Sequence, residues 1–212
     1  MRTIDLETWS RREHFRLFTA KDFPYFSLVA NVDLAAFYPV VKQRRISFTV
    51  AIVYVIARAA NEIPEFRYRI RGREVVEHEI VHPSITILTG DDLFSFCTFV
   101  YTQDFSSFAA RATEQIAFAK EHRSIEDEPG RDDYLFMTAI PWISFTSLVH
   151  PVQLSPADSV PRIAWGRYFG QGEGLQMPLN LQAHHALIDG IHAGRFYEKV
   201  QDYLRDPDFI PD

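Results

Sequence analysis

The alternation of apolar and polar residues predicts a chain with frequent short strands. In residues 25–32 every second residue is apolar, which is the period of a strand with one buried face. Residues 163–169 and 175–182 predict a hairpin that turns through a glycine-rich segment, and its second strand leads into His184 and His185. Shorter runs predict further strands at 66–70, 74–76, 84–88, 93–101, 134–139 and 143–149.

Apolar residues at helical spacing predict helices among these strands. Residues 48–63 are apolar nearly all round, which is typical of a buried helix, and Pro64 lies just beyond its end. Asp33 is a suitable N-cap for a helix from Leu34, although Pro39 limits its regularity. Frequent hairpins mixed with helices favour an α/β (α+β) fold with a mixed, largely antiparallel sheet and packed helices. The other predicted helices cover 5–19, 105–123 and 190–204, and the predicted loops cover 124–133 and 151–161.

Length and composition narrow the class of protein. The 212 residues are 47% apolar, which is enough for a sizeable core, and no linker divides them, so we expect a single domain over 1–212. The 22 basic and 28 acidic residues give a net charge of −6, which does not support nucleic-acid binding. A single cysteine, Cys97, excludes an intrachain disulfide framework. The apolar stretch at 50–60 is too short to span a bilayer, so we expect a soluble protein of a reducing compartment, without a membrane partner.

Residues 182–192 carry the densest group of candidate catalytic side chains. A histidine can act as a general base near neutral pH, and Asp189 follows His185 at a spacing that lets both face the same way on a helical turn. The residues alone leave other interpretations open. The histidines could be surface or hydrogen-bonded core residues, and His184, His185, Asp189 and His192 could bind a metal, although no thiolate and no H-E-x-x-H pattern supports one.

Three motifs lie far apart in the chain: WSRREHF at residues 9–15, TAIPWISF at 138–145 and HHALIDG at 184–190. The last resembles the H-H-x-x-x-D-G signature of CoA-dependent acyltransferases. The first two resemble the W-x-R-x-x-H-F pattern and the S-A-x-P-W-x-x-F segment of the chloramphenicol acetyltransferase family. The three matches follow the order and spacing of the family, so the resemblance covers nearly the whole chain.

The resemblance implies catalytic roles for the matching residues. His185 matches the base that removes a proton from the acceptor hydroxyl, and Asp189 matches a mainly structural aspartate paired with an arginine at the position of Arg11. Thr138 stands where the family has a serine whose hydroxyl stabilises the tetrahedral oxyanion. Threonine keeps that hydroxyl, but it adds a methyl group and restricts χ1.

The resemblance also implies the ligands. Acetyl-CoA is the expected co-substrate, no metal is expected, and Trp142 and Tyr168 match positions near the pantetheine arm of CoA. Transfer is expected to be direct, in a ternary complex, and Cys97 is a poor nucleophile candidate because its apolar neighbours suggest a buried strand. Chloramphenicol is the expected acceptor, with another alcohol or amine as the alternative. The expected acceptor-pocket residues are Phe18, Phe94, Phe96 and His150, with Asp22 and Arg162 as further polar residues at apolar positions of the family pocket.

The chain length implies an oligomer when it is combined with the resemblance. Larger relatives join two such folds in one chain, whereas this chain has room for one, so the resemblance implies a homotrimer with active sites at subunit interfaces. The use of acetyl-CoA implies a cytoplasmic location. Two other classes stay open: a non-catalytic ligand-binding relative, and the core of a dihydrolipoyl acyltransferase, whose family favours D-H-R where this chain has residues 184–186, HHA.

Overall fold

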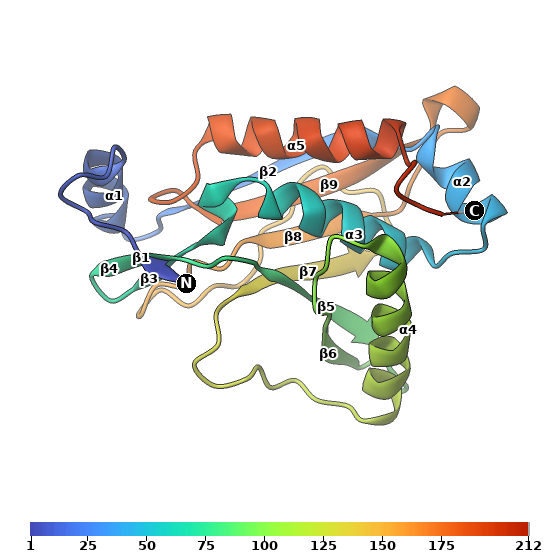
Figure 1. Ribbon diagram of the computed structural model, residues 1–212, viewed down its shortest axis with the longest axis horizontal. Coiled ribbons are helices and arrows are strands. Elements are labelled where there is room, and N and C mark those ends of the chain that lie inside the picture. Colours follow the sequence, from blue (N-terminus) through green and yellow to red (C-terminus); the bar gives the residue numbers. More distant parts are fainter. Residues whose placement is uncertain (212) are drawn as a thin grey trace.

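The computed structural model describes residues 1–211, and Asp212, the last residue of the predicted domain, lies outside the described residues. A six-stranded sheet forms its centre, with helices α3 (Phe48–Asn61) and α5 (Gly190–Arg205) on one face (Figure 1). Helix α4 (Phe105–Glu121) lies at the end of the molecule opposite to α1 (Arg12–Thr19). The remaining helical elements are α2 (Phe37–Gln43) and the short 3₁₀ turns Pro64–Arg67 and Gly172–Gly174.

The strands of the central sheet are β2 (Tyr25–Asp33), β5 (His82–Leu88), β6 (Phe94–Thr98), β7 (Tyr134–Ile140), β8 (Arg162–Gly166) and β9 (Gln176–His184). Their order across the sheet is β2-β9-β8-β7-β5-β6. The pairs β2–β9, β8–β9 and β5–β6 are antiparallel, and β5–β7 and β7–β8 are parallel. A smaller antiparallel sheet has the order β1-β4-β3, and it consists of β1 (Arg2–Thr3), β3 (Tyr68–Arg71) and β4 (Glu74–Glu77). The predicted mixed, largely antiparallel sheet with packed helices is confirmed.

The period of two along each strand gives the central sheet two different faces. The face under α3 and α5 is apolar and part of the core, with buried side chains such as Ile85, Met137, Ile163 and Leu181. The opposite face, here called the open face, carries polar residues at the alternate positions, among them Thr86, Thr138, Arg162, Asn180 and Gln182. The alternation therefore brings hydroxyl, amide and charged side chains together on one surface.

Helix α3 is buried because its sequence is apolar on every side. Its residues Val50 to Ala57 are all buried, as the sequence predicts. The side-chain oxygen of Ser47 caps the helix by accepting a hydrogen bond from the N–H of Val50. The helix packs between the sheet and its helical neighbours, so it supports the strands that carry the open face.

The first two predicted helices begin later in the structure than the sequence indicates. The helix predicted at 5–19 begins at Arg12, because the Asp5 carboxylate instead accepts hydrogen bonds from the N–H of Glu7 and the hydroxyl of Thr8. The helix predicted from Leu34 begins at Phe37, which places Pro39 in the first turn, where a missing N–H breaks no helical hydrogen bond.

The strand predicted at 143–149 is wrong. This segment crosses the open face as irregular chain, and side chains of the sheet bind its backbone instead of a strand partner. The carbonyl of Leu148 accepts from the hydroxyl of Ser27 and the amide of Asn180. Gln182 makes a pair of bonds to the N–H and C=O of His150. Polar residues of β2 and β9 thus hold the segment over one half of the open face.

Candidate active site

His185 lies just beyond the end of β9, in the turn that leads into α5. Its N–H donates to the carbonyl of Pro24 at 2.7 Å, which ties the turn to the start of β2. Its imidazole stacks on Phe18 of α1 with 3.9 Å between ring centroids, and Phe26 of β2 lies at 5.0 Å. The side chain is still 33% exposed. The ring is therefore fixed between two aromatic side chains and remains open to a ligand.

Arg11 and Asp189 hold the turn around His185. Arg11 Nη1 lies 2.5 Å from Asp189 Oδ2, and Arg11 Nη2 donates to the carbonyl of His185 at 3.5 Å. Asp189 Oδ1 lies 2.9 Å from His185 Nδ1, at angles outside hydrogen-bond geometry. Burial alone would raise the pKa of Asp189, but the hydrogen bond and charge of Arg11 outweigh it and lower the pKa. We call the group Arg11, Phe18, Phe26, His185 and Asp189 the His185 corner.

The two neighbouring histidines have structural contacts. His184 is 2% exposed, its Nδ1 accepts from the N–H of Ala186 at 3.2 Å, and burial lowers its pKa to about 4. His192 Nδ1 accepts from the N–H of Asp189 at 2.9 Å and its Nε2 lies 3.4 Å from Glu65. His184 is therefore neutral near pH 7, and His192 helps to fix the first turn of α5. Among these histidines, His185 has the exposure that a base needs.

Thr138 lies on the open face and lines a cavity of about 380 Å³. The cavity has an apolar wall and a row of hydroxyls, and Thr138 Oγ1 lies 2.6 Å from Thr86 Oγ1. We call this site the Thr138 cavity; its lining residues are Ser84, Thr86, Phe94, Phe96, Asp127, Phe136, Met137, Thr138, His150, Pro151 and Arg162.

One end of the Thr138 cavity is charged. Arg162 forms an ion pair with Asp158, donates to the carbonyl of Val160 at 3.1 Å and lies over the ring of Phe136. Burial and the charge of Asp158 raise the pKa of Asp127 at this end. Burial likewise lowers the pKa of His150, which favours its neutral form. The cavity thus presents both aromatic rings and charged or polar side chains to a ligand.

The predicted acceptor residues fall in two places. Phe94, Phe96, His150 and Arg162 line the Thr138 cavity. Phe18 does not line it, because α1 places this ring against His185. Asp22 is exposed in the chain between α1 and β2 and also lies outside the cavity lining.

The two residues predicted to contact CoA are surface aromatics. Trp142 follows β7 and is 61% exposed. Tyr168 follows β8, and its hydroxyl lies 3.0 Å from that of Tyr38, with Phe48 as a further ring neighbour. Neither ring belongs to the core, so both are accessible to a ligand.

His185 and Thr138 do not converge within one chain. Thr138 pairs with Ala164, which pairs with Asn180, so Thr138 lies two strands away from β9 and well before the end of that strand. Standard strand dimensions then separate the Cα atoms of Thr138 and His184 by about 16 Å. His185 also contacts Phe26, on the helix-covered side of β2, whereas Thr138 lies on the open face. One chain thus holds the two candidate catalytic residues in separate places.

Sequence analysis missed six of the residues that line the Thr138 cavity, namely Ser84, Thr86, Asp127, Phe136, Met137 and Pro151. The alternation in 84–88 and 134–139 already places Thr86 and Phe136 on one face of their strands. It does not give the register between β5 and β7, which brings Thr86 beside Thr138. Asp127 lies in the 124–133 loop, and no pattern in the sequence indicates where that loop packs.

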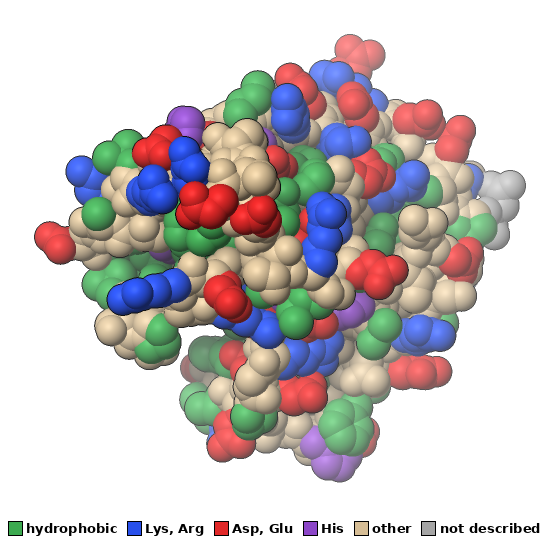
Figure 2. Space-filling view, turned by 60° about the vertical axis from the view of Figure 1, so that its left-hand side comes forward, with side chains coloured by type: hydrophobic (Ala, Val, Ile, Leu, Met, Phe, Trp, Pro, Cys, Tyr) green, Lys and Arg blue, Asp and Glu red, His purple; other side chains and the backbone are tan. Residues whose placement is uncertain are grey.

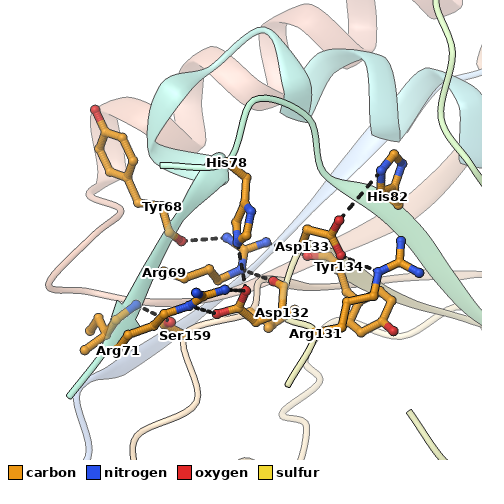
Figure 3. Close-up of polar contacts among 12 residues, drawn as sticks. Tyr68, Arg69, Arg71, His78, His82, Arg131, Asp132, Asp133, Tyr134 and Ser159 are labelled. Carbon is orange, nitrogen blue, oxygen red and sulfur yellow. Dashed lines mark hydrogen bonds and ion pairs between the residues drawn. The ribbon is translucent and has the colours of Figure 1, made fainter. Parts of the chain in front are cut away.

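A buried arginine network anchors the end of this loop (Figure 3). Arg69 of β3 is 0% exposed and donates its hydrogen bonds to backbone carbonyls. Arg71 and His78 bind the carboxylate of Asp132 at 2.6 and 2.8 Å. The carbonyls that accept from Arg69 belong to Phe66, Tyr68, Asp132 and Tyr134. The network therefore joins the small sheet to Tyr134 at the start of β7. Phe136, two residues further along this strand, lines the Thr138 cavity.

The visible surface, the potential metal ligands, the helices and the cysteine of the described residues indicate whether the chain meets the needs of other kinds of site. Figure 2 shows acidic and basic side chains interspersed over the visible face. Within residues 1–211, no three His, Cys, Asp or Glu side chains come together in a way that would hold a metal ion. None of the helices in this part of the chain has the length and apolar character that crossing a bilayer requires. Cys97 is buried and its pKa is raised to about 11 by that burial, so its thiol is a poor nucleophile.

Comparisons with known proteins agree with the three motifs. The family model "Chloramphenicol acetyltransferase" matches residues 1–201. A chloramphenicol acetyltransferase of Klebsiella sp. is 32% identical over 202 residues, which cover 95% of this chain and 92% of the relative. Chloramphenicol acetyltransferase 2 of Escherichia coli is 28% identical over 200 residues, 93% of this chain and 94% of the relative.

Solved structures give the same result for the fold. A chloramphenicol acetyltransferase structure superposes with a TM-score of 0.84 at 28% identity and covers 96% of this chain and 99% of its own. Dihydrolipoamide acetyltransferase of Azotobacter vinelandii has a TM-score of 0.64 at 20% identity, with 92% of this chain and 86% of its own covered, which shows a shared fold alone. The resemblance and the fold class predicted from the sequence are confirmed.

Proposed function

The chain belongs to the chloramphenicol acetyltransferase family, and we propose that it transfers the acetyl group of acetyl-CoA to a hydroxyl of chloramphenicol. The prediction of an acyltransferase follows from membership in this family. The observation that carries the assignment to particular residues is the His185 corner. An imidazole held between Phe18 and Phe26, with its Nδ1 turned toward Asp189, leaves Nε2 as the nitrogen that faces an acceptor.

The proposed reaction is a direct transfer. Neutral His185 accepts the proton of the acceptor hydroxyl at Nε2 while the acceptor oxygen attacks the thioester carbonyl. The hydroxyl of Thr138 donates to the oxyanion of the tetrahedral intermediate. The carbon–sulfur bond then breaks, and the imidazolium returns its proton to the departing thiolate. The products are the acetyl ester and CoA, and no covalent enzyme intermediate is required.

We further propose that the working enzyme is a homotrimer, with one acetyltransferase domain in each chain. The separation of His185 from Thr138 supports this proposal, because a site that uses both needs a second copy of the chain. Exposed apolar side chains such as Ile143 and Val149 provide surface for such contacts. Light scattering should give the mass of three chains at assay concentration, and a mass near one chain would contradict the proposal.

Trp142 and Tyr168 are the residues proposed to contact the CoA arm, and the Thr138 cavity is the proposed acceptor pocket. The charged side chains of the Thr138 cavity are a specific reason to consider acceptors other than chloramphenicol. Asp127 and Arg162 suit alcohols or amines that form hydrogen bonds. A relative that serves such an acceptor is the second candidate function.

A thiol-release assay with acetyl-CoA and chloramphenicol tests the proposed function. We expect release that depends on chloramphenicol and is lost in His185→Ala, with the oligomer intact. Release with other alcohols or amines but not with chloramphenicol would favour the second candidate. Binding of chloramphenicol without any release would identify a non-catalytic relative.

A further inference from the structure

The hydroxyl of Thr138 has a specific neighbour in the Thr138 cavity. Thr86 Oγ1 of β5 lies 2.6 Å from Thr138 Oγ1 of β7, and both side chains line the cavity. The parallel register of the two strands produces this contact, because Ile85 pairs with Met137 and the next residues on each strand face the open side. Within residues 1–211, each of these two hydroxyls has the other as its hydrogen-bond partner.

The direction of this hydrogen bond decides what Thr138 can do. A hydroxyl has one proton to donate and two lone pairs that accept. If Thr138 donated to Thr86, it would have no proton for an oxyanion. If Thr86 donates, the proton of Thr138 is free to point into the cavity, and accepting a bond makes Thr138 a stronger donor.

We infer that Thr86 is a positioning residue, which donates to Thr138 and thereby directs the Thr138 hydroxyl at the oxyanion. This inference rests on the proposed function. It also accounts for a threonine at a position where the family pattern has serine. Threonine has a β-branched side chain with restricted χ1, and the contact with Thr86 selects the rotamer that keeps the oxygen on the cavity side.

The same face of the sheet offers a matched control. Thr98 of β6 donates to Ser84 of β5 at 3.1 Å, so it is another threonine hydroxyl on the open face with a hydroxyl partner. Neither Thr98 nor Ser84 is a hydrogen-bond partner of Thr138 in the described chain. Thr98→Val thus removes a comparable hydrogen bond and leaves the Thr86–Thr138 pair in place.

The test is a double-mutant cycle on steady-state kinetics. We expect Thr138→Ala to lower kcat about 100-fold and Thr86→Val to lower it about 10-fold, with both KM values within about twofold of the wild type. Because Thr86 acts through Thr138, the double variant should be no slower than Thr138→Ala alone. Thr86→Ser should restore kcat to within about threefold of the wild type. Thr98→Val should match the wild type.

Two results would overturn the inference. In the first, Thr86→Val has the same kcat as Thr98→Val. In the second, the losses of Thr86→Val and Thr138→Ala multiply in the double variant, which would make Thr86 independent of Thr138. Equal melting temperatures of Thr86→Val and Thr98→Val keep a folding defect from being read as a loss of positioning.

Failure of the proposed function has a different signature. If the wild type releases no thiol with chloramphenicol, that proposal fails, and the same variants are compared on acetyl-CoA hydrolysis. Water then replaces the alcohol as the nucleophile, but the same oxyanion forms. The double-mutant cycle therefore still measures the coupling between Thr86 and Thr138. A Thr86→Val variant that hydrolyses acetyl-CoA as fast as the wild type would reject the positioning role.

Discussion

The His185 corner and the Thr138 cavity each hold one candidate catalytic side chain, but they do so by different physical means. The corner uses an ion pair and ring stacking between segments from both ends of the chain, with Arg11 and Phe18 on one side and His185 and Asp189 on the other. The cavity uses the register of adjacent strands, which places Thr86 and Thr138 in contact. The corner should therefore respond to pH and to loss of charge, whereas the cavity should respond to changes of shape and of hydroxyl groups.

The largest expected effect is the recovery of activity when one chain of a trimer provides His185 and a neighbouring chain provides Thr138. His185→Ala and Thr138→Ala chains are coexpressed with different affinity tags, and trimers that contain both are purified. Each parent should have about 1% of wild-type activity or less. Mixed trimers should recover about a third of it, because one site of three joins an intact His185 to an intact Thr138.

Mixed trimers with no more activity than their parents would place both residues of each site in the same chain, against the proposal. A mixture of the two separately purified parents, without coexpression, is the control for contamination. It should remain at the level of the parents as long as the trimers do not exchange subunits.

The sequence alone predicts most strands and helices that carry the two regions. It does not predict which distant segments pack against one another. The period of two in 25–32 and the hairpin at 163–182 predict β2, β8 and β9 with ends within three residues of the observed ones. The strand at 143–149 could not be excluded, because its extended pattern is real and its backbone partners are the side chains of Ser27, Asn180 and Gln182 on distant strands.

The same limit applies to the candidate site. The motifs identify His185, Asp189, Arg11 and Thr138, since each motif lies within a few neighbouring residues. Thr86 carries no motif, and its relation to Thr138 depends on strand pairing over a long sequence separation. The position of Phe18 at His185 rather than in the cavity likewise depends on where α1 packs.

The second prediction concerns the acid stability of the turn next to the His185 corner. The lowered pKa of His184, about 4 in the folded chain, is below the ordinary value of about 6.5, so the unfolded chain takes up the proton first. The contribution of His184 to the stability should fall by about 3 kcal/mol as the pH drops from about 6.5 to 4, and the lowered pKa values of His82, His150 and His192 act in the same direction. The lowered pKa of Asp189 affects stability in a lower pH range. Its stabilising contribution is present above about pH 4 and is lost as the pH falls below that value.

Urea unfolding at a series of pH values, at fixed protein concentration, measures this loss. His184→Gln should flatten the slope between pH 6.5 and 4, and Thr138→Ala, in the cavity, should leave it unchanged. An unchanged slope in His184→Gln would show that another group takes up the proton.

The third prediction tests the ion pair of the corner. Arg11→Met should destabilise the protein by about 2 kcal/mol, because it leaves the partly buried carboxylate of Asp189 without its partner. The double variant Arg11→Met, Asp189→Asn should recover part of this loss, since the uncompensated charge is removed. Thermal unfolding of Arg11→Met, Asp189→Asn and the double variant measures the coupling, and strictly additive losses would show that the two side chains have no interaction energy.

The smallest expected effect separates positioning of the base from binding of the acceptor. Phe18→Leu removes the ring that stacks on His185, so kcat should fall about fivefold, corresponding to about 1 kcal/mol of stacking. Phe94→Leu is the matched change in the Thr138 cavity, and it should raise KM for chloramphenicol with kcat nearly unchanged, because this ring lines the proposed acceptor pocket and is not among the rings that contact His185. If Phe18→Leu instead raised KM alone, Phe18 would belong to the acceptor pocket, as its sequence position first suggested, and the division between the two regions would have to be redrawn across the subunit interface.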